Sequence, residues 1–144
     1  MEKPTVLIID DHQLIRDMWT RVLEDSGQVQ VLKYSGRLTQ TMSIIEEMKP
    51  NIILLDVHMT PLSGFELMPI IRQNSPDSRV IGFSVHTNAK YAQQMLQLGA
   101  SGYVTKGAEV SEVLEAISEV AKGNIYLNSE IRETIDKLQK ATSK

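Results

Sequence analysis

Short apolar runs of strand length alternate with segments of helical periodicity along nearly the whole chain. The five runs are residues 6–9, 29–32, 52–55, 80–85 and 103–104. Each is followed by a segment in which apolar residues recur at spacings of three or four, as they do on one face of an amphipathic helix. Five repeats of a strand and a helix predict one α/β domain, a doubly wound five-stranded parallel sheet with helices on both faces.

Several residues mark the positions of these helices. Ser63, with Glu66 three residues later, predicts a capping box at the start of the third helix. Pro69 lies inside that helix, where we expect it to remove one backbone hydrogen bond and bend the helix. Trp19, in the first helix, is expected in the core. A sixth helix is predicted from residue 129, with one apolar stripe formed by Ile131, Ile135 and Leu138.

The composition excludes several classes of function. The 144 residues include no cysteine, so disulfides, thiolate metal sites and cysteine nucleophiles are ruled out. The formal net charge of −3 argues against nucleic acid as a direct partner, because proteins that grip a phosphate backbone usually carry a basic patch. No apolar run is long enough to span a bilayer, and the first residues lack a signal-peptide pattern. We therefore expect a cytoplasmic location and no membrane partner.

Carboxylates follow two of the predicted strands. Asp10 and Asp11 come directly after the first strand, and Asp56 comes after the third. In a doubly wound sheet of order 2-1-3-4-5 these strands are neighbours, and ligands bind beyond their carboxyl ends. Two charges about 4 Å apart repel by about 4 kcal/mol at an effective dielectric constant of about 20. The three carboxylates therefore predict a hard divalent cation, and oxygen ligands favour magnesium, manganese or calcium over zinc.

Two more polar residues are expected at the same edge of the sheet. Ser84 closes the fourth strand, and Lys106 follows the fifth. A hydroxyl and an ammonium group beside carboxylates and a divalent cation are suited to a phosphoryl group, whose charge the cations balance. Asp56 is then a carboxylate nucleophile that forms an acyl phosphate.

This pattern resembles the receiver domain of two-component response regulators, a CheY-like domain with the flavodoxin-like fold. The resemblance extends to about residue 128. It is carried by residues 6–12 and 53–59, by Gly64, by the pair Phe83-Ser84 and by residues 99–106. It implies a signalling switch that catalyses only its own phosphorylation and dephosphorylation, and is not otherwise an enzyme.

The resemblance also implies a role for each residue at the acidic edge. Asp56 is the implied phosphoacceptor, and Lys106 is the implied phosphate partner. Asp11, Asp56 and the backbone carbonyl of His58 would bind Mg²⁺, or Mn²⁺, directly, and Asp10 would act through water. The implied phosphate source is a sensor histidine kinase or a small phosphodonor.

Two residues would carry the conformational response. Ser84 would be the switch hydroxyl, and Tyr103 the switch aromatic. The new phosphoryl group would draw Ser84 towards it, and Tyr103 would swing into the space left behind. The face made by the fourth helix, the fifth strand and the fifth helix would then repack, as a population shift between two states, and a homodimer could form.

Three features resemble the NarL/FixJ (LuxR-type) subclass, whose members continue into a helix-turn-helix DNA-binding domain. They are His12 after the acid pair, Tyr103 three residues before Lys106, and residues 123–128 after the fifth helix. We expect residues 1–128 to be the receiver domain, and residues 129–144 to begin a linker to a DNA-binding output domain that controls transcription. DNA would be a partner only through that domain, which this chain lacks. A free-standing receiver is the alternative.

The loop after the phosphoacceptor departs from the family pattern. The family usually has proline directly after the position of Met59, whereas here Thr60 follows and Pro61 comes one residue later. This difference leaves the course of the loop open.

His58 and His86 lie two residues after Asp56 and Ser84, at places that in this family influence how water reaches the acyl phosphate. We hypothesise that this imidazole pair tunes dephosphorylation and makes it depend on pH near neutrality. The alternative is that both are exposed loop histidines without a role.

Two other functions are compatible with these residues. A phosphorylation-independent receiver would act only as a binding module, and failure to bind Mg²⁺ would favour it. A phosphatase could share the aspartate and Mg²⁺ chemistry, but such an enzyme needs a second acid, and the residue two after Asp56 is His58. Repeated turnover of a phosphate ester would distinguish the phosphatase.

Overall fold

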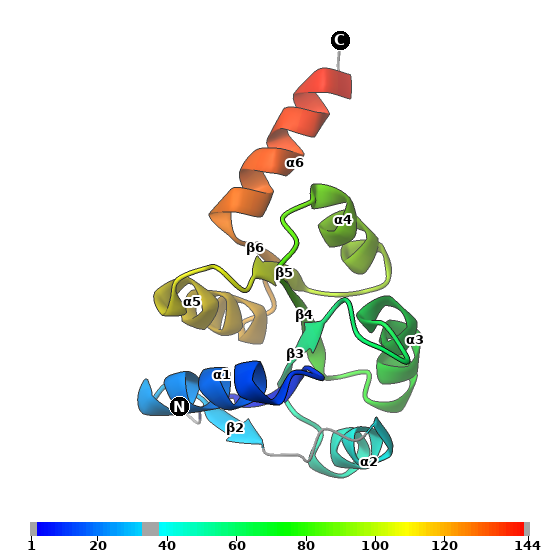
Figure 1. Cartoon of the computed structure of the whole chain (residues 1–144), viewed down its shortest axis with the longest axis vertical. Coiled ribbons are helices and arrows are strands. Elements are labelled where there is room, and N and C mark those ends of the chain that lie inside the picture. The colour runs from blue at the N-terminus through cyan, green and yellow to red at the C-terminus, as the bar shows by residue number, and fades with distance from the viewer. Residues whose placement is uncertain (1–2, 33–37, 143–144) are drawn as a thin grey trace.

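A parallel sheet lies at the centre of the computed structural model, which describes residues 3–32 and 38–142 (Figure 1). Its strands are β1 Thr5–Ile9, β2 Gln30–Leu32, β3 Ile52–Asp56, β4 Arg79–Ser84, β5 Gly102–Thr105 and β6 Tyr126–Leu127. Their order is β2-β1-β3-β4-β5-β6, and each neighbouring pair is parallel. The predicted doubly wound sheet of order 2-1-3-4-5 is confirmed, with a sixth strand, β6, added at its edge.

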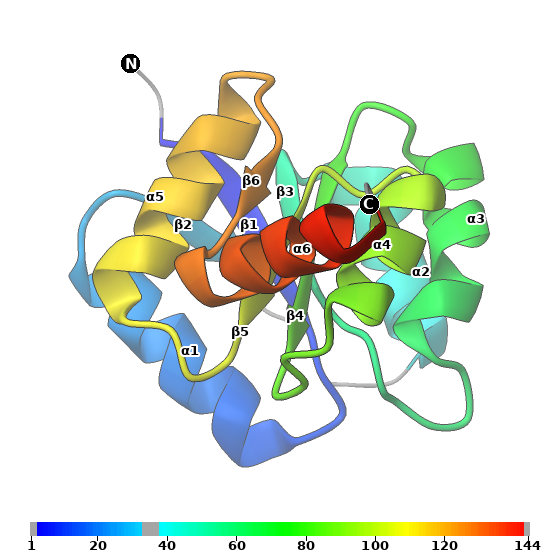
Figure 2. The same ribbon diagram turned by 90° about the horizontal axis from the view of Figure 1, so that it is seen from above.

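Helices cover both faces of the sheet. They are α1 Gln13–Asp25, α2 Leu38–Met48, α3 Gly64–Asn74, α4 Ala89–Gln97, α5 Val110–Ala121 and α6 Ser129–Thr142. The helices α1 and α5 lie on one face, and α2, α3 and α4 lie on the other (Figures 1 and 2). Within the described ranges, no helix is long and apolar enough to cross a membrane.

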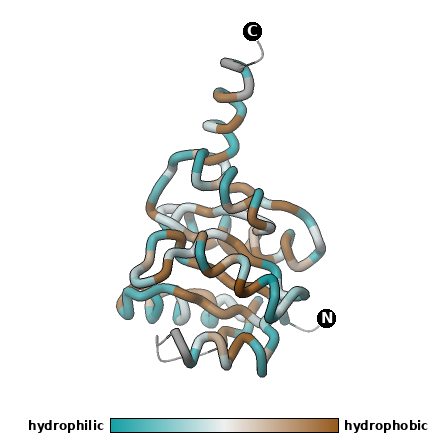
Figure 3. The backbone as a smooth tube through the Cα atoms, turned by 90° about the vertical axis from the view of Figure 1, so that its right-hand side faces the viewer, coloured by the Kyte–Doolittle hydropathy of each residue, from teal (hydrophilic) through white to brown (hydrophobic). Residues whose placement is uncertain are grey.

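Two hydrophobic cores flank the sheet, because successive strand residues point to opposite faces. Ile8 and Leu54 pack in the core with residues of α1 and α5, whereas Leu7 and Ile53 pack in the core with residues of α3 and α4. The most hydrophobic stretches accordingly run through the middle of the molecule (Figure 3). Burial on both faces explains why the strands read as continuous apolar runs.

The helix α1 packs on the sheet along one stripe. Trp19 and Leu23 are buried, which confirms Trp19 as a core residue. The Trp19 ring meets the Phe83 ring edge-on, with 5.1 Å between the centroids. Trp19 therefore contacts β4 one residue before Ser84, close to the edge where the predicted site residues gather.

The helix α3 begins as the sequence predicts. The Ser63 side chain accepts a hydrogen bond from the Glu66 N–H at 3.2 Å, and the Glu66 carboxylate accepts one from the Ser63 N–H at 3.1 Å. Pro69 lies inside this helix. The preceding loop contains a cis peptide bond between Thr60 and Pro61.

The last helix is packed against the domain at its start. The strand β6 pairs with β5 and leads directly into α6, which contacts α4 and β5 (Figure 2). Ile131 of α6 is fully buried, in the same core as Tyr103. Residues 143 and 144 of the predicted tail lie outside the described residues.

Candidate functional site

The predicted carboxylates meet at the carboxyl edge of the sheet. Asp10 directly follows β1, and Asp56 is the last residue of β3, the neighbouring strand. One ligand atom from each of Asp10, Asp11, His12 and Asp56 lies within 4.8 Å of the others. Asp10 and Asp56 are buried, whereas Asp11 and His12 are exposed. The sheet order alone thus brings acids 46 positions apart in the chain into one cluster.

Lys106, which directly follows β5, adds a positive charge to this cluster. Its Nζ lies 2.6 Å from Oδ2 of Asp10 and 3.4 Å from Oδ2 of Asp56. The Lys106 side chain is only 8% exposed, so its charge is held within the site and not on the surface. Lys106 is positioned by the end of β5, where its N–H donates to the Ser84 carbonyl at 2.8 Å.

The two buried carboxyls differ in acidity. Burial acts to raise the pKa of Asp10, but hydrogen bonds from Lys106 and His12 outweigh it, so this pKa lies below its ordinary value. Burial raises the pKa of Asp56; the charge of Lys106 opposes the rise and that of Asp10 adds to it, and the net pKa is above the ordinary value. Asp10 therefore forms the closer ion pair with Lys106, and Asp56 is the more basic of the two carboxylates.

The donor set fits a hard divalent cation. Asp10, Asp11 and Asp56 supply carboxylate oxygens that converge on one region, and oxygen ligands of this kind are preferred by Mg²⁺, Mn²⁺ and Ca²⁺. The structure adds His12, whose Nδ1 lies 3.1 Å from a carboxylate oxygen of Asp10 and 3.1 Å from one of Asp11. His12 is also the N-cap residue of α1; the sequence alone marks it only as a feature of the subclass and not as a neighbour of both carboxylates.

Ser84 and Tyr103 are both buried behind this cluster. In the sheet register Ser84 stands one position beyond Phe83, the partner of Asp56. The Ser84 hydroxyl accepts a hydrogen bond from the His86 N–H at 3.1 Å. The Tyr103 ring is fully buried, and its hydroxyl donates to the His86 carbonyl at 3.0 Å. The Tyr103 ring thus points into the core in this structure.

His58 and His86 lie against each other at the mouth of the site. Their ring centroids are 4.1 Å apart, and Tyr91 lies against both rings, at 4.7 Å from His58 and 5.5 Å from His86. The His58 N–H also donates to Oδ1 of Asp56 at 3.2 Å. Partial burial, helped by His86 and Lys106, lowers the pKa of His58, so its neutral form is favoured. Both residues are exposed, as expected for loop histidines, but they form an aromatic cluster.

Gly64 closes the loop that carries Asp56. Its N–H donates to the Val57 carbonyl at 2.9 Å. A Cβ atom at this position would lie 2.6 Å from the Asp56 carbonyl oxygen and 2.8 Å from the Val57 Cα. Only glycine allows this approach, so Gly64 sets the course of the backbone directly after Asp56.

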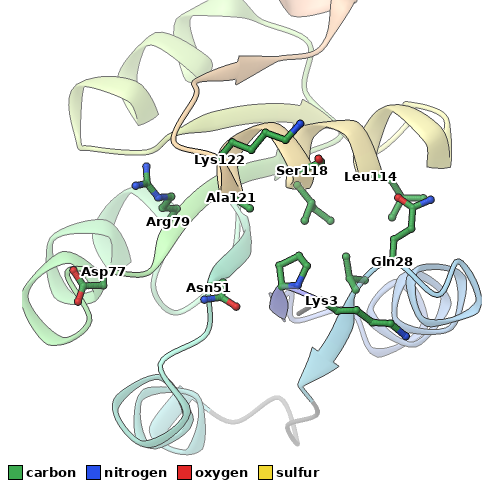
Figure 4. A pocket seen from close by; sticks show the side chains of 12 residues that line it. Lys3, Gln28, Asn51, Asp77, Arg79, Leu114, Ser118, Ala121 and Lys122 are labelled. Carbon is green, nitrogen blue, oxygen red and sulfur yellow. The ribbon is translucent and has the colours of Figure 1, made fainter. Parts of the chain in front are cut away.

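A pocket of about 460 Å³ lies elsewhere, between α5 and the amino ends of the strands (Figure 4). Its lining includes Lys3, Asn51, Arg79 and Lys122, and none of the predicted site residues. The candidate site is therefore the open carboxyl edge of the sheet and not this pocket.

Comparison with known proteins identifies the family of this site. The family profile described as the response regulator receiver domain matches residues 6–118. This chain is a response regulator receiver domain. Receiver domains are signalling switches, and the resemblance seen in the sequence is confirmed.

The curated relatives point to the predicted subclass of this receiver. Response regulator GacA of Pseudomonas viridiflava is 33% identical over 130 residues, which are 90% of this chain and 61% of GacA. Transcriptional regulatory protein DegU of Brevibacillus brevis is 30% identical over 135 residues, 94% of this chain and 57% of DegU. The receiver thus spans about three fifths of the length of these relatives.

Solved structures agree with the fold and with the subclass. A LuxR-family two-component response regulator from Aurantimonas sp. SI85-9A1 superposes with a TM-score of 0.89 and 25% identity, over 96% of this chain and 99% of that one. The receiver domain of the putative response regulator NarL from Mycobacterium tuberculosis gives a TM-score of 0.78 and 31% identity, over 86% and 100%. The NarL/FixJ-type assignment is therefore confirmed.

Proposed function

We propose that this receiver is a phosphorylation-dependent switch that accepts a phosphoryl group on Asp56. One observation carries the proposal: the buried Lys106 ammonium lies 2.6 Å from Asp10 and 3.4 Å from Asp56, at the edge where the carboxylates gather. A charge fixed there is ready to balance negative charge that develops beside Asp56.

In the proposed step a carboxylate oxygen of Asp56 attacks the donor phosphorus, and the bond from phosphorus to the leaving group breaks. With a phosphohistidine donor the leaving group is an imidazole nitrogen, and with acetyl phosphate it is acetate. Lys106 and Ser84 donate hydrogen bonds to the transferred phosphoryl oxygens. Only this self-modification, and its slow hydrolysis, is proposed as catalysis.

The proposed metal ligands are Asp11, Asp56 and the His58 carbonyl, with Asp10 acting through water. Mg²⁺, or Mn²⁺, when bound supplies positive charge that neutralises the carboxylates and the phosphoryl oxygens. A solved response regulator from Burkholderia pseudomallei, at 25% identity and a TM-score of 0.72, is described with a phosphorylated aspartic acid and a calcium ion. That pairing supports an oxygen-liganded divalent cation beside Asp56 here.

The proposed response follows from the contacts of Ser84 and Tyr103. A phosphoryl group on Asp56 draws the Ser84 hydroxyl towards it, and this favours the inward Tyr103. The two positions of Tyr103 are alternative states, so phosphorylation changes their populations.

The proposed partners lie outside this chain. We propose a sensor histidine kinase or a small phosphodonor as the phosphate source, and a homodimer as a product of phosphorylation. We propose further that residues 129–144 begin a linker to a DNA-binding output domain that controls transcription. The relatives named for response and transcriptional regulation extend beyond the matched region, which supports this arrangement.

We propose that the His58–His86 pair tunes the lifetime of the acyl phosphate. The two rings lie 4.1 Å apart, and the backbone N–H groups of His58 and His86 donate to Asp56 and Ser84 respectively, so both rings stand directly beside the site. Replacing both imidazoles by alanine should change the rate constant for loss of the phosphoryl group, measured from pH 6 to 8 after removal of the donor. Identical decay curves for wild type and the double variant would leave the pair without this role.

The phosphoacceptor is tested by intact-protein mass spectrometry after incubation with acetyl phosphate, with and without Mg²⁺. One added phosphoryl group is expected on the wild type with Mg²⁺ only, and none on Asp56→Ala. Asp77→Ala, which removes an exposed aspartate outside the cluster, is the matched control and should be modified like wild type. No adduct in any condition, with no response to beryllofluoride, would leave a receiver-shaped binding module.

A further inference from the structure

The residue that precedes α6 is bonded to the switch strand at two points. The Asn128 N–H donates to the Tyr103 carbonyl at 3.3 Å, and its side-chain Nδ2 donates to Oγ1 of Thr105 at 3.0 Å. Asn128 and Thr105 are each only 2% exposed. Tyr103 is the switch aromatic, and Thr105 directly precedes Lys106. Asn128 therefore joins the root of α6 to the part of β5 that carries the site.

Tyr103 extends this connection to the phosphorylation site. Its hydroxyl donates to the His86 carbonyl, and the His86 N–H donates to the Ser84 hydroxyl. A continuous path of hydrogen bonds thus runs from Ser84 through His86 and Tyr103 to Asn128. Contiguous contacts of this kind can carry energetic coupling when the element at the end has two arrangements.

The body of α6 depends on the same strand. Ile131 is fully buried in the core that contains Tyr103, and α6 contacts α4 and β5. On its other side the root is held by Glu112, whose carboxylate accepts from the Ser129 N–H at 3.1 Å and from the Tyr126 hydroxyl at 3.3 Å. The position of α6 over α4 is therefore set by its first turn (Figure 2).

Asn128 has an alternative use for its side chain. Its Oδ1 is buried and accepts no hydrogen bond from the described residues, which is costly for a polar atom. Asn128 also stands at the N-cap position of α6, where an asparagine oxygen commonly accepts an N–H of the first turn. To cap α6, the Asn128 side chain would have to turn away from β5 and lose its hydrogen bond to Thr105. The two arrangements would therefore exclude each other. A second arrangement of Asn128, capping α6 in place of bonding to Thr105, would give the root of α6 the two states that such coupling needs.

We propose that Asn128 is a positioning residue that couples α6 to the phosphorylation site. With Tyr103 inward, Asn128 bonds to Thr105 and α6 is docked on α4 and β5. Phosphorylation of Asp56 favours the inward Tyr103 and therefore tightens this docking. The inference rests on the proposed function and adds to it the element that the switch moves.

The test measures hydrogen–deuterium exchange of the α6 amides by mass spectrometry, with and without beryllofluoride and Mg²⁺. Binding is followed in the same samples by the fluorescence of Trp19, the single tryptophan, which contacts Phe83. In wild type, α6 exchange should slow by roughly fivefold, the lower end of the range for energetic coupling between two sites. In Asn128→Ala and Thr105→Val, beryllofluoride should still bind, but α6 exchange should be the same with and without it.

Two further variants separate coupling from a merely structural role. Thr105→Ser keeps the hydroxyl and should restore the response that Thr105→Val loses. Asn124→Ala removes an exposed asparagine bonded to Glu119 and should respond like wild type. If Asn128→Ala fails to fold, the Thr105 pair decides.

The outcomes distinguish the inference from the function on which it rests. Beryllofluoride binding by wild type with unchanged or faster α6 exchange overturns the coupling and leaves the phosphorylation switch intact. A wild-type response that persists in Asn128→Ala and Thr105→Val overturns the role of Asn128. Absence of binding by wild type removes the proposed function itself.

Discussion

Gly82 of β4 makes room for the buried Tyr103 ring. A Cβ atom at position 82 would lie 2.9 Å from Cδ2 of Tyr103 and 3.5 Å from Cε of Met95. Contacts below 3.0 Å force a neighbour to move, and the Tyr103 ring is the nearest neighbour. The buried position of the Tyr103 ring thus depends on the missing side chain of Gly82 on the adjacent strand.

The variant Gly82→Ala should displace the Tyr103 ring from this position. Overpacking of a filled core costs about 1–3 kcal/mol, so we expect a loss of this size in the free energy of unfolding. Urea denaturation followed by Trp19 fluorescence measures it. Gly107→Ala is the control, because no atom lies within 4 Å of a Cβ there. Equal stability of the two variants would show that the ring does not need the space.

At the scale of helices and strands, the sequence predicts those elements that have a periodic apolar pattern or a capping motif. The five longer strands follow from apolar runs, and the start of α3 follows from Ser63 and Glu66. The strand β6 has two residues, which is too few for an alternating pattern. Its pairing with β5 depends on where α5 returns the chain, and that is a property of the packed domain.

Tyr126 of β6 ties this short strand to α5. Its hydroxyl lies 3.3 Å from carboxylate oxygens of Glu112 and Glu115, and burial with these carboxylates raises the pKa of Tyr126 to about 12. Since the pKa is raised in the folded state, the neutral phenol stabilises the fold below about pH 10. That contribution is lost as the pH rises from about 10 to about 12.

The variant Tyr126→Phe should therefore flatten the alkaline loss of stability. We expect it to lower the free energy of unfolding at neutral pH by about 1 kcal/mol, from the lost hydrogen bonds. Between about pH 10 and 12 its stability should fall less steeply than that of wild type. Urea unfolding at a series of pH values checks both effects, and parallel curves for the two proteins in the alkaline range would contradict the assignment.

Across the whole molecule, the sheet order explains why the residues of the candidate site could be predicted from the sequence. It also explains which contacts could not be predicted. Asp10, Asp56 and Lys106 are far apart in the chain, but each stands at the end of a strand or directly after one, and parallel strands end at one edge. The contact of His12 with two carboxylates depends on the turn into α1, and no spacing encodes it. The proposed role of Asn128 could not be predicted from the sequence, because its two bonds to β5 exist only once β6 has paired.

The acidic cluster should also govern the stability of the entire domain. Asp11→Asn removes one charge from the cluster, so the metal-free protein should melt at a higher temperature than wild type. Mg²⁺ at about one hundred times the dissociation constant of wild type should raise the free energy of unfolding of wild type by about 2.7 kcal/mol. At the same concentration it should raise that of Asp11→Asn much less. Thermal unfolding with and without Mg²⁺ measures this, with Asp17→Asn, an exposed residue of α1, as the control. An equal gain from Mg²⁺ in both variants would exclude Asp11 as a ligand.

The geometry of α6 converts small changes at its root into larger ones at its tip. The helix has 14 residues and is therefore about 21 Å long. A rotation of about 10° about Asn128 would sweep its far end through about 4 Å, roughly two thirds of the rise of one helical turn. If the hydrogen bond between Asn128 and Thr105 were exchanged for another, α6 would rotate about Asn128 while the sheet stayed fixed. Anything attached to the tip would be displaced while the core stays in place.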